Sequence, residues 1–185
     1  MTLPASVEGR ATLRLFVALT LPPPVLSAIE AWQQAQLVGH DRVVPREYLH
    51  LTLAFLGSRP SVDAALVAAQ VRAACASLEA PPVLEVRAYR ETRSVGMLVL
   101  ADEGGRAAAL AEDVQRRLEQ LGIYTRESRP WLPHVTVLRF RRPPRLRPSL
   151  PDLGAFSPSG AAVYHSLLRP GGARYVVLDS VALGG

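Results

Sequence analysis

The chain has 185 residues and 49% of them are hydrophobic, so it can bury a core as one domain or as two small, closely packed lobes. Its formal net charge of +5 comes entirely from arginine, because the sequence contains no lysine. A single cysteine, Cys75, excludes an internal disulfide and a cysteine-based metal site, and no segment is long enough to cross a membrane.

The first elements along the chain are a leader, a strand and a helix. Residues 1–11 are expected to form a flexible leader. Residues 13–21 predict a core strand rather than a signal peptide, because prolines end them at once and no small-residue cleavage site follows. We therefore expect a cytoplasmic protein. Prolines are tolerated in the first turn of a helix, and the apolar positions that follow them recur at helical spacing: Val25, Leu26, Ile29, Trp32 and Leu37.

The next strand, residues 49–56, carries the sequence His50-Leu51-Thr52-Leu53 and is closed by Gly57 and Pro60. Ser61 is placed to cap a second helix that runs to about residue 78, where a proline pair stops it. Its expected apolar positions include Val62, Leu66, Ala69 and Val71. Two strands are expected after it, at residues 83–91 and 95–101.

The second half of the chain repeats this order. A helix ends at Gly122, which suits a C-terminal glycine cap, and its apolar face contains Ala107, Leu110, Ala111, Val114, Leu118 and Leu121. The next strand, at 135–140, begins within the sequence His134-Val135-Thr136-Val137. An Arg-Pro-rich loop at 141–151 and strands at 161–167 and 175–183, joined by Pro170-Gly171-Gly172, complete the chain.

The order of strand, helix and His-Thr strand thus occurs twice at similar spacing. This predicts an α+β fold of two pseudo-symmetric lobes related by an approximate two-fold axis. We expect residues 12–185 to form a single bilobal domain built from two interleaved pseudo-repeats, each with one His-x-Thr strand.

The two tetrapeptides indicate a shared chemistry. Side chains at i and i+2 of a strand point to the same face, so each His lies beside its Thr. A two-fold axis would bring both faces together around one small volume. Imidazole has an unperturbed pKa of about 6.5 and can take or give a proton near neutral pH. Two imidazoles on opposite sides of a phosphorus atom could activate water and protonate the leaving oxygen, while the Thr hydroxyls hold phosphoryl oxygens without a metal.

These motifs resemble the two-histidine (2H) phosphoesterase superfamily, and within it the RNA 2′,3′-cyclic phosphodiesterases formerly called 2′-5′ RNA ligases. The match is carried by RLFVALTLP at 14–22, YLHLTLAFLG at 48–57, PHVTVLRF at 133–140 and GGARYVVL at 171–178. The resemblance implies antiparallel sheets that line a central groove, with helices outside. It also implies metal-independent hydrolysis of a 2′,3′-cyclic phosphodiester to a 2′-phosphomonoester. By the same resemblance, His50 is the proton donor, His134 is the proton acceptor, and Thr52 and Thr136 bind phosphate.

Secondary candidates are less clear. Arg139 lies five residues after His134, and this odd offset places it on the opposite face unless the strand twists or bulges. It is either a phosphate contact or part of a structural salt bridge. Tyr175 either lines the groove, where it could stack on a base, or packs in the core. His165 and His40 are interpreted as packed or surface residues.

Other functions are also compatible with parts of the sequence. The arginine content reflects either a codon bias over a solvated surface or a use of guanidinium groups to bind nucleotides or RNA. A metal site at the two histidines lacks further ligands at suitable spacing. A non-catalytic nucleotide-binding module and a 2′-5′ RNA ligase working in reverse remain alternatives to the hydrolase. We expect no cofactor, RNA ends or small cyclic nucleotides as substrates, no membrane, and a monomer.

Overall fold

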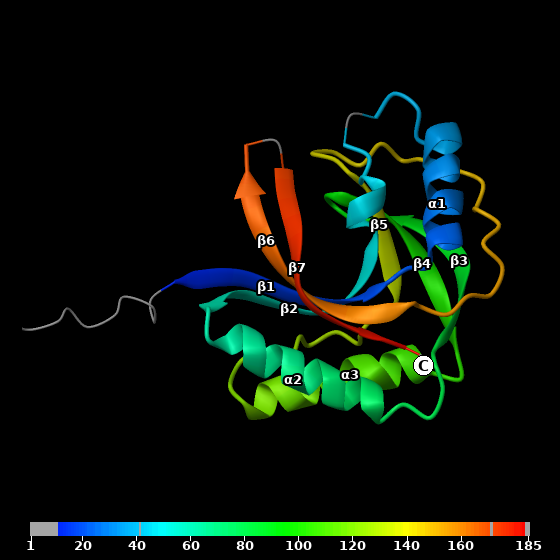
Figure 1. The fold of residues 1–185 in the computed structure, drawn as a ribbon. Helices are drawn as coiled ribbons and strands as arrows, with labels where there is room; N and C mark the ends of the chain where they lie inside the picture. Colours follow the sequence, from blue (N-terminus) through cyan, green and yellow to red (C-terminus); the bar gives the residue numbers. More distant parts are fainter. Residues whose placement is uncertain (1–10, 41, 171, 184–185) are drawn as a thin grey trace, which may run out of the picture.

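The computed structural model describes residues 11–40, 42–170 and 172–183. The expected leader therefore lies outside the described residues except for Ala11. Within the described ranges the chain forms two antiparallel sheets and three α-helices, which confirms the predicted α+β class (Figure 1). None of these helices is long and apolar enough to cross a membrane.

Sheet A has four strands and is built around the first predicted strand. Its order is β2-β1-β6-β7, with every neighbouring pair antiparallel. Residues 15–19 of β1 are all buried, because this central strand is covered on both faces. The last two strands form the expected hairpin, of which Gly171 lies outside the described residues. The bounds are β1 (Thr12–Thr20), β2 (His50–Pro60), β6 (Gly160–Arg169) and β7 (Gly172–Ala182).

Sheet B has the order β3-β4-β5, and its strands are β3 (Val83–Glu91), β4 (Val95–Glu103) and β5 (His134–Arg139). The outer edge of β5 is partly covered by the segment before η2 (Arg46–Tyr48). In that segment Val44 N donates a hydrogen bond to Val137 O at 3.0 Å, and Val43 forms a bridge with Leu138. The chain that leads into the first His-Thr strand is therefore bonded to the second one.

The helices cross between the sheets. The helix α1 (Pro23–Gln36) follows β1 of sheet A, yet Gln33 Nε2 donates to the carbonyl oxygen of Val137 in sheet B. The helix α3 (Arg106–Gln120) follows β4 of sheet B, yet Gln115 Nε2 donates to Leu53 O in sheet A. Figure 1 shows α2 (Asp63–Ala76) beside α3, under sheet A. The helices α1 and α3 are thus each hydrogen-bonded to the sheet that the preceding strand does not belong to, and the single domain at residues 12–185 stays a prediction.

Two expectations about α2 are wrong. The helix begins at Asp63 with Val62 in the N-cap position and no side-chain cap, so Ser61 does not cap it; the Ser61 amide donates to Ala11 O at 2.8 Å and extends the pairing of β1 with β2 by one residue. Of the expected apolar positions, Val62 and Leu66 are 62% and 49% exposed, Ala69 is also exposed, and Val71 alone is buried. The buried face is made of smaller side chains that let α2 pack closely on α3 and β6: Val67, Ala68, Val71, Ala74 and Cys75. Because small and apolar residues occur all around α2, their helical spacing does not distinguish this face from the predicted one.

Gly57 also does not end its strand. The backbone φ of Gly57 is +69°, a value that glycine adopts without strain, and β2 continues to Pro60. Bulges at this point let the strand change direction and stay paired with β1. Leu121, expected on the apolar face of α3, lies beyond the end of that helix and is 46% exposed.

Candidate active site

The two His-Thr strands present the same surface. In β2, His50 and Thr52 are partly exposed, whereas Leu51 and Leu53 between and after them are buried. The strand β5 has the same sequence of partly exposed and buried positions over its whole length. The alternation predicted from the two tetrapeptides is therefore present in both strands.

A bulge follows the motif in β5 and decides where Arg139 points. Thr136 lies opposite Met97, but Leu138 lies opposite Gly96, the adjacent residue of β4, so Val137 is an extra residue. Val137 and Leu138 are both fully buried, and Arg139 is exposed. The bulge thus reverses the expected alternation and returns Arg139 to the face of His134.

The equivalent bulge in β2 returns an aromatic residue to the His50 face. Thr52 lies opposite Ala18 and Ala54 lies opposite Val17, with Leu53 as the extra residue. Phe55 is consequently 46% exposed, and the guanidinium carbon of Arg14 lies 4.8 Å from its ring centroid. The two strands share this bulge, but β2 presents the aromatic ring of Phe55 where β5 presents the cation of Arg139.

Both imidazoles are held in the same orientation. His50 Nδ1 lies 2.7 Å from Tyr48 O, and His134 Nδ1 lies 2.8 Å from Leu132 O. A carbonyl oxygen only accepts, so Nδ1 carries the hydrogen in each ring, and Nε2 is left as the atom that takes or gives a proton. His50 Nε2 lies 3.2 Å from Thr52 Oγ1, which confirms that this pair shares one face.

The pKa of His50 is lowered from 6.5 to about 4. Burial is the main cause, because it penalises the charged ring. The bond to Tyr48 O opposes this effect, and the positive charges of Arg139 and His134 add to it. These two residues of sheet B therefore act on a histidine of sheet A, and β2 lies alongside β5. Among the described residues Arg139 forms no ion pair, which disfavours the salt-bridge interpretation.

Aromatic rings pack around His50. The ring centroids of Phe16, Tyr175 and Tyr164 lie 5.0, 5.5 and 6.1 Å from that of His50. Tyr48 contacts Tyr175 with centroids 4.9 Å apart. Burial raises the pKa of the Tyr164 hydroxyl. Tyr175 is partly exposed and its ring packs beside the imidazole, and its stacking on a base stays a prediction. The sequence did not predict that the ring of Phe16 packs on His50 or that the ring of Tyr48 packs on Tyr175. These contacts depend on how the strands pair.

Trp131 connects the two motifs directly. Its indole Nε1 donates to Thr52 O at 2.8 Å. Trp131 lies three residues before His134, whereas the acceptor belongs to the first motif, so this bond fixes one strand relative to the other. Nothing in the sequence pattern points to this contact.

The other histidines lie elsewhere. His165 alternates with Tyr164 along β6 and so points to the side of sheet A that the helices cover. His40 lies in the turn after α1. Across the described residues, no three His, Cys, Asp or Glu side chains are grouped as metal ligands would be.

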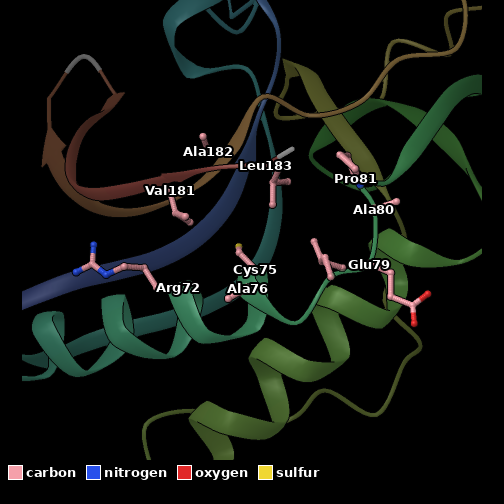
Figure 2. A pocket seen from close by; sticks show the side chains of 10 residues that line it. Arg72, Cys75, Ala76, Glu79, Ala80, Pro81, Val181, Ala182 and Leu183 are labelled. Atoms are coloured by element: carbon pink, nitrogen blue, oxygen red, sulfur yellow. The ribbon is translucent and has the colours of Figure 1, made fainter. Parts of the chain in front are cut away.

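A cavity of about 390 Å³ lies on the helix side of sheet A, away from both motifs. Figure 2 shows that it is formed between the end of α2 and β7, with Cys75 and Val181 among its lining residues. Burial raises the pKa of the Cys75 thiol to about 11, so this thiol is unreactive near neutral pH. The cavity has no connection with the chemistry of the histidines.

Comparisons with known proteins agree with this arrangement. A family model described as the 2′-5′ RNA ligase superfamily matches residues 21–167. A curated protein of Thermus thermophilus named RNA 2′,3′-cyclic phosphodiesterase is 32% identical over 188 residues, covering 94% of this chain and 91% of that protein.

Solved structures share the fold. The crystal structure of TT0787 of Thermus thermophilus has a TM-score of 0.76 and 33% identity, covering 92% of this chain and 98% of that one. Escherichia coli LigT complexed with 3′-AMP has a TM-score of 0.77, covering 95% of this chain and 100% of that one. Its identity is 22%, so this second likeness concerns the fold alone.

Proposed function

Because the chain belongs to the 2′-5′ RNA ligase superfamily, we propose that it hydrolyses RNA ends that carry a 2′,3′-cyclic phosphate to 2′-phosphomonoesters. The observation that carries this proposal is the pair of histidines, one on each sheet, with both Nδ1 atoms held by carbonyls and with His134 lowering the pKa of His50. The name of the Thermus thermophilus relative supports the choice of substrate.

His134 is proposed as the proton acceptor. Its Nδ1–H donates to Leu132 O, so the lone pair on Nε2 is available to take a proton from water. The water oxygen then forms a bond to phosphorus as the bond from phosphorus to the 3′ oxygen breaks. The proton on His134 returns to solvent after the product leaves.

His50 is proposed as the proton donor to the departing 3′ oxygen. Its ring is neutral near pH 7 in the free protein, because its pKa is lowered to about 4. The phosphodiester brings a negative charge that offsets the positive charge of Arg139, and a nearby anion favours the imidazolium form. Substrate binding itself therefore prepares His50 to act as an acid.

Four further side chains are proposed to position the substrate. The hydroxyls of Thr52 and Thr136 would donate hydrogen bonds to nonbridging phosphoryl oxygens, and Arg139 would neutralise their charge. Tyr175, beside the His50 ring, would contact the nucleoside. Together they would hold phosphorus in line between the two Nε2 atoms.

We also propose that the reaction needs no metal ion and that the protein acts as a cytoplasmic monomer. The ligase direction is allowed by microscopic reversibility, but bulk water drives the equilibrium toward hydrolysis. Product analysis tests the metal independence and the reaction together.

The test uses a 5′-labelled oligoribonucleotide that ends in a 2′,3′-cyclic phosphate, incubated with the protein in EDTA. We expect a 2′-phosphorylated product, identified against synthetic 2′- and 3′-phosphorylated standards. His165→Ala is the matched control for His134→Ala, because His165 lies on the face of sheet A opposite to that of His50, and it should retain full activity. A 3′-phosphorylated product, or activity lost in EDTA and restored by added metal, would overturn the proposal.

A further inference from the structure

Five exposed arginines lie at the end of sheet B where β5 leaves the sheet. We call this group the arginine end, and its members are Arg93, Arg139, Arg141, Arg142 and Arg145. Only Arg139 has been connected with the candidate site. The other four belong to the turn between β3 and β4 or to the loop after β5.

Specific hydrogen bonds bring these segments together. Phe140 N donates to Ser94 O at 3.0 Å, which places the turn containing Arg93 beside the start of the loop. Figure 1 shows the yellow-to-gold segment after β5 leaving this end of sheet B.

The loop is then fastened by a carboxylate. The amides of Arg145 and Leu146 each donate to Glu91 at 2.8 Å, one to each carboxylate oxygen. Arg145 has a φ of 60°, which is costly for a residue with a side chain. Successive amides in such a conformation form an anion-binding nest, and here Glu91 occupies it. The strained backbone of Arg145 directs the two amides to Glu91, and these two hydrogen bonds keep Arg145 at this end of sheet B.

The positive charges of the arginine end are not neutralised within the described residues. None of its five guanidinium groups forms a salt bridge or hydrogen bond there. Glu91, the acid fastened to the loop, is already bonded to two amides and to the Tyr89 hydroxyl. By contrast, seven other arginines do form ion pairs: Arg46, Arg59, Arg72, Arg87, Arg116, Arg117 and Arg126.

We propose that Arg93, Arg141, Arg142 and Arg145 of the arginine end bind the phosphate backbone of single-stranded RNA upstream of the cyclic end, with Arg139 at the cyclic phosphate. The inference rests on the proposed function, because it assigns the substrate as an oligonucleotide rather than a cyclic mononucleotide. β5 connects the two places: its backbone runs from His134 to Arg139 over about 16 Å at roughly 3.3 Å per residue, and the loop with Arg141 and Arg142 follows it. A chain held at the histidines would thus follow β5 to the arginines. Guanidinium groups suit this ligand, since they bind phosphate in a bidentate manner.

The test compares two triple variants with the same change in net charge. Arg93→Gln/Arg141→Gln/Arg142→Gln changes the arginine end without touching Arg139 or the histidines. Arg106→Gln/Arg116→Gln/Arg126→Gln is the control, on and beside α3 under sheet A. Substrates are uridine 2′,3′-cyclic phosphate and an oligouridylate of about ten nucleotides with the same cyclic end.

We expect the first variant to lose roughly ten- to a hundredfold in kcat/KM on the oligonucleotide, from about one phosphate contact per arginine. Its activity on the mononucleotide and both activities of the control should match wild type. The slope of log kcat/KM against log salt concentration should become less steep by about two for the oligonucleotide only. Equal losses on both substrates, or equal losses in both variants, would overturn the inference.

A binding measurement separates this inference from the proposed function. Fluorescence anisotropy with a labelled oligouridylate that ends in a 2′-phosphate needs no turnover. Weaker binding by the first variant alone would support the arginine end even if wild type hydrolyses neither substrate. Unchanged binding by that variant would overturn it even if wild type hydrolyses both.

Discussion

The low pKa of His50 predicts a specific loss of stability in acid. The folded protein holds this ring neutral down to about pH 4, whereas the unfolded chain takes up a proton at its ordinary pKa of 6.5. Between these values the unfolded state binds more protons, so the free energy of unfolding decreases as the pH falls. The contribution is fully present above pH 6.5 and is lost as the pH falls through about 4.

The size of this loss follows from the difference between the two pKa values. At about 1.36 kcal/mol per pKa unit, His50 should cost about 2 kcal/mol of stability by about pH 5 and about 3 kcal/mol by about pH 4. This is a large part of the stability of a domain of this size. His50→Gln removes the titrating group and keeps a polar side chain of similar length, so its stability should fall less steeply with pH.

The assay is urea unfolding followed by tryptophan fluorescence, at several pH values, for wild type, His50→Gln and the control His165→Gln. The quantity compared is the slope of the unfolding free energy against pH, since the substitution also changes its level. Wild type and His165→Gln should share a steep slope, and His50→Gln should be flatter by about 3 kcal/mol over the range. Parallel curves for wild type and His50→Gln would refute the buried, cation-flanked setting of this ring.

Three further predictions concern residues around the histidines. Arg139→Gln removes a positive charge that lowers the pKa of His50, so the limb of the kcat/KM profile that reports His50 should move to higher pH. An unmoved limb would show that Arg139 does not act on His50. Thr136→Val removes a hydroxyl while keeping its shape, and should lower kcat/KM roughly tenfold or more, because hydrogen bonds to charged groups contribute about 1.5–3 kcal/mol. If the Thr136→Val variant kept the wild-type kcat/KM, Thr136 would be excluded from phosphate binding. Trp131→Phe removes the bond to Thr52 O and should cost about 1 kcal/mol of stability and lower kcat. Trp32→Phe, which loses a bond to Ser149 O far from the motifs, should cost similar stability with kcat unchanged. Equal kinetics in these two variants would remove Trp131 from the positioning of the site.

Most of the fold was predictable from local patterns. Prolines, glycines and apolar spacing indicated each strand and helix to within a few residues. The errors share one cause, which is tertiary packing that local signals do not contain. Leu66 is exposed because the face of α2 that contains Val67, Val71 and Ala74 is the one that packs, and β2 continues through Gly57 because bulges keep it paired with β1. The amide of Ser61 is bonded to Ala11, a residue from a distant segment.

The site was predictable where it depends on two-residue alternation and not where it depends on bulges or long-range contacts. His50, Thr52, His134 and Thr136 lie on the faces that alternation predicts. Arg139 does not follow from alternation, because Val137 is an extra residue in the ladder. The environment of His50 comes from rings on other strands, whose neighbours are known only from the sheet register. The catalytic roles of these residues stay predictions.

The central claim is that the two imidazoles act on one phosphorus atom, and kinetics of single and double variants test it most directly. Turnover of a cyclic-ended oligonucleotide is measured for His50→Ala, His134→Ala and the double variant, with circular dichroism to establish that each is folded. We predict that each single variant loses most of the turnover and that the double variant is little worse than either, because the two groups serve one step. A single variant that keeps most of its turnover, or losses that multiply in the double variant, would contradict the claim.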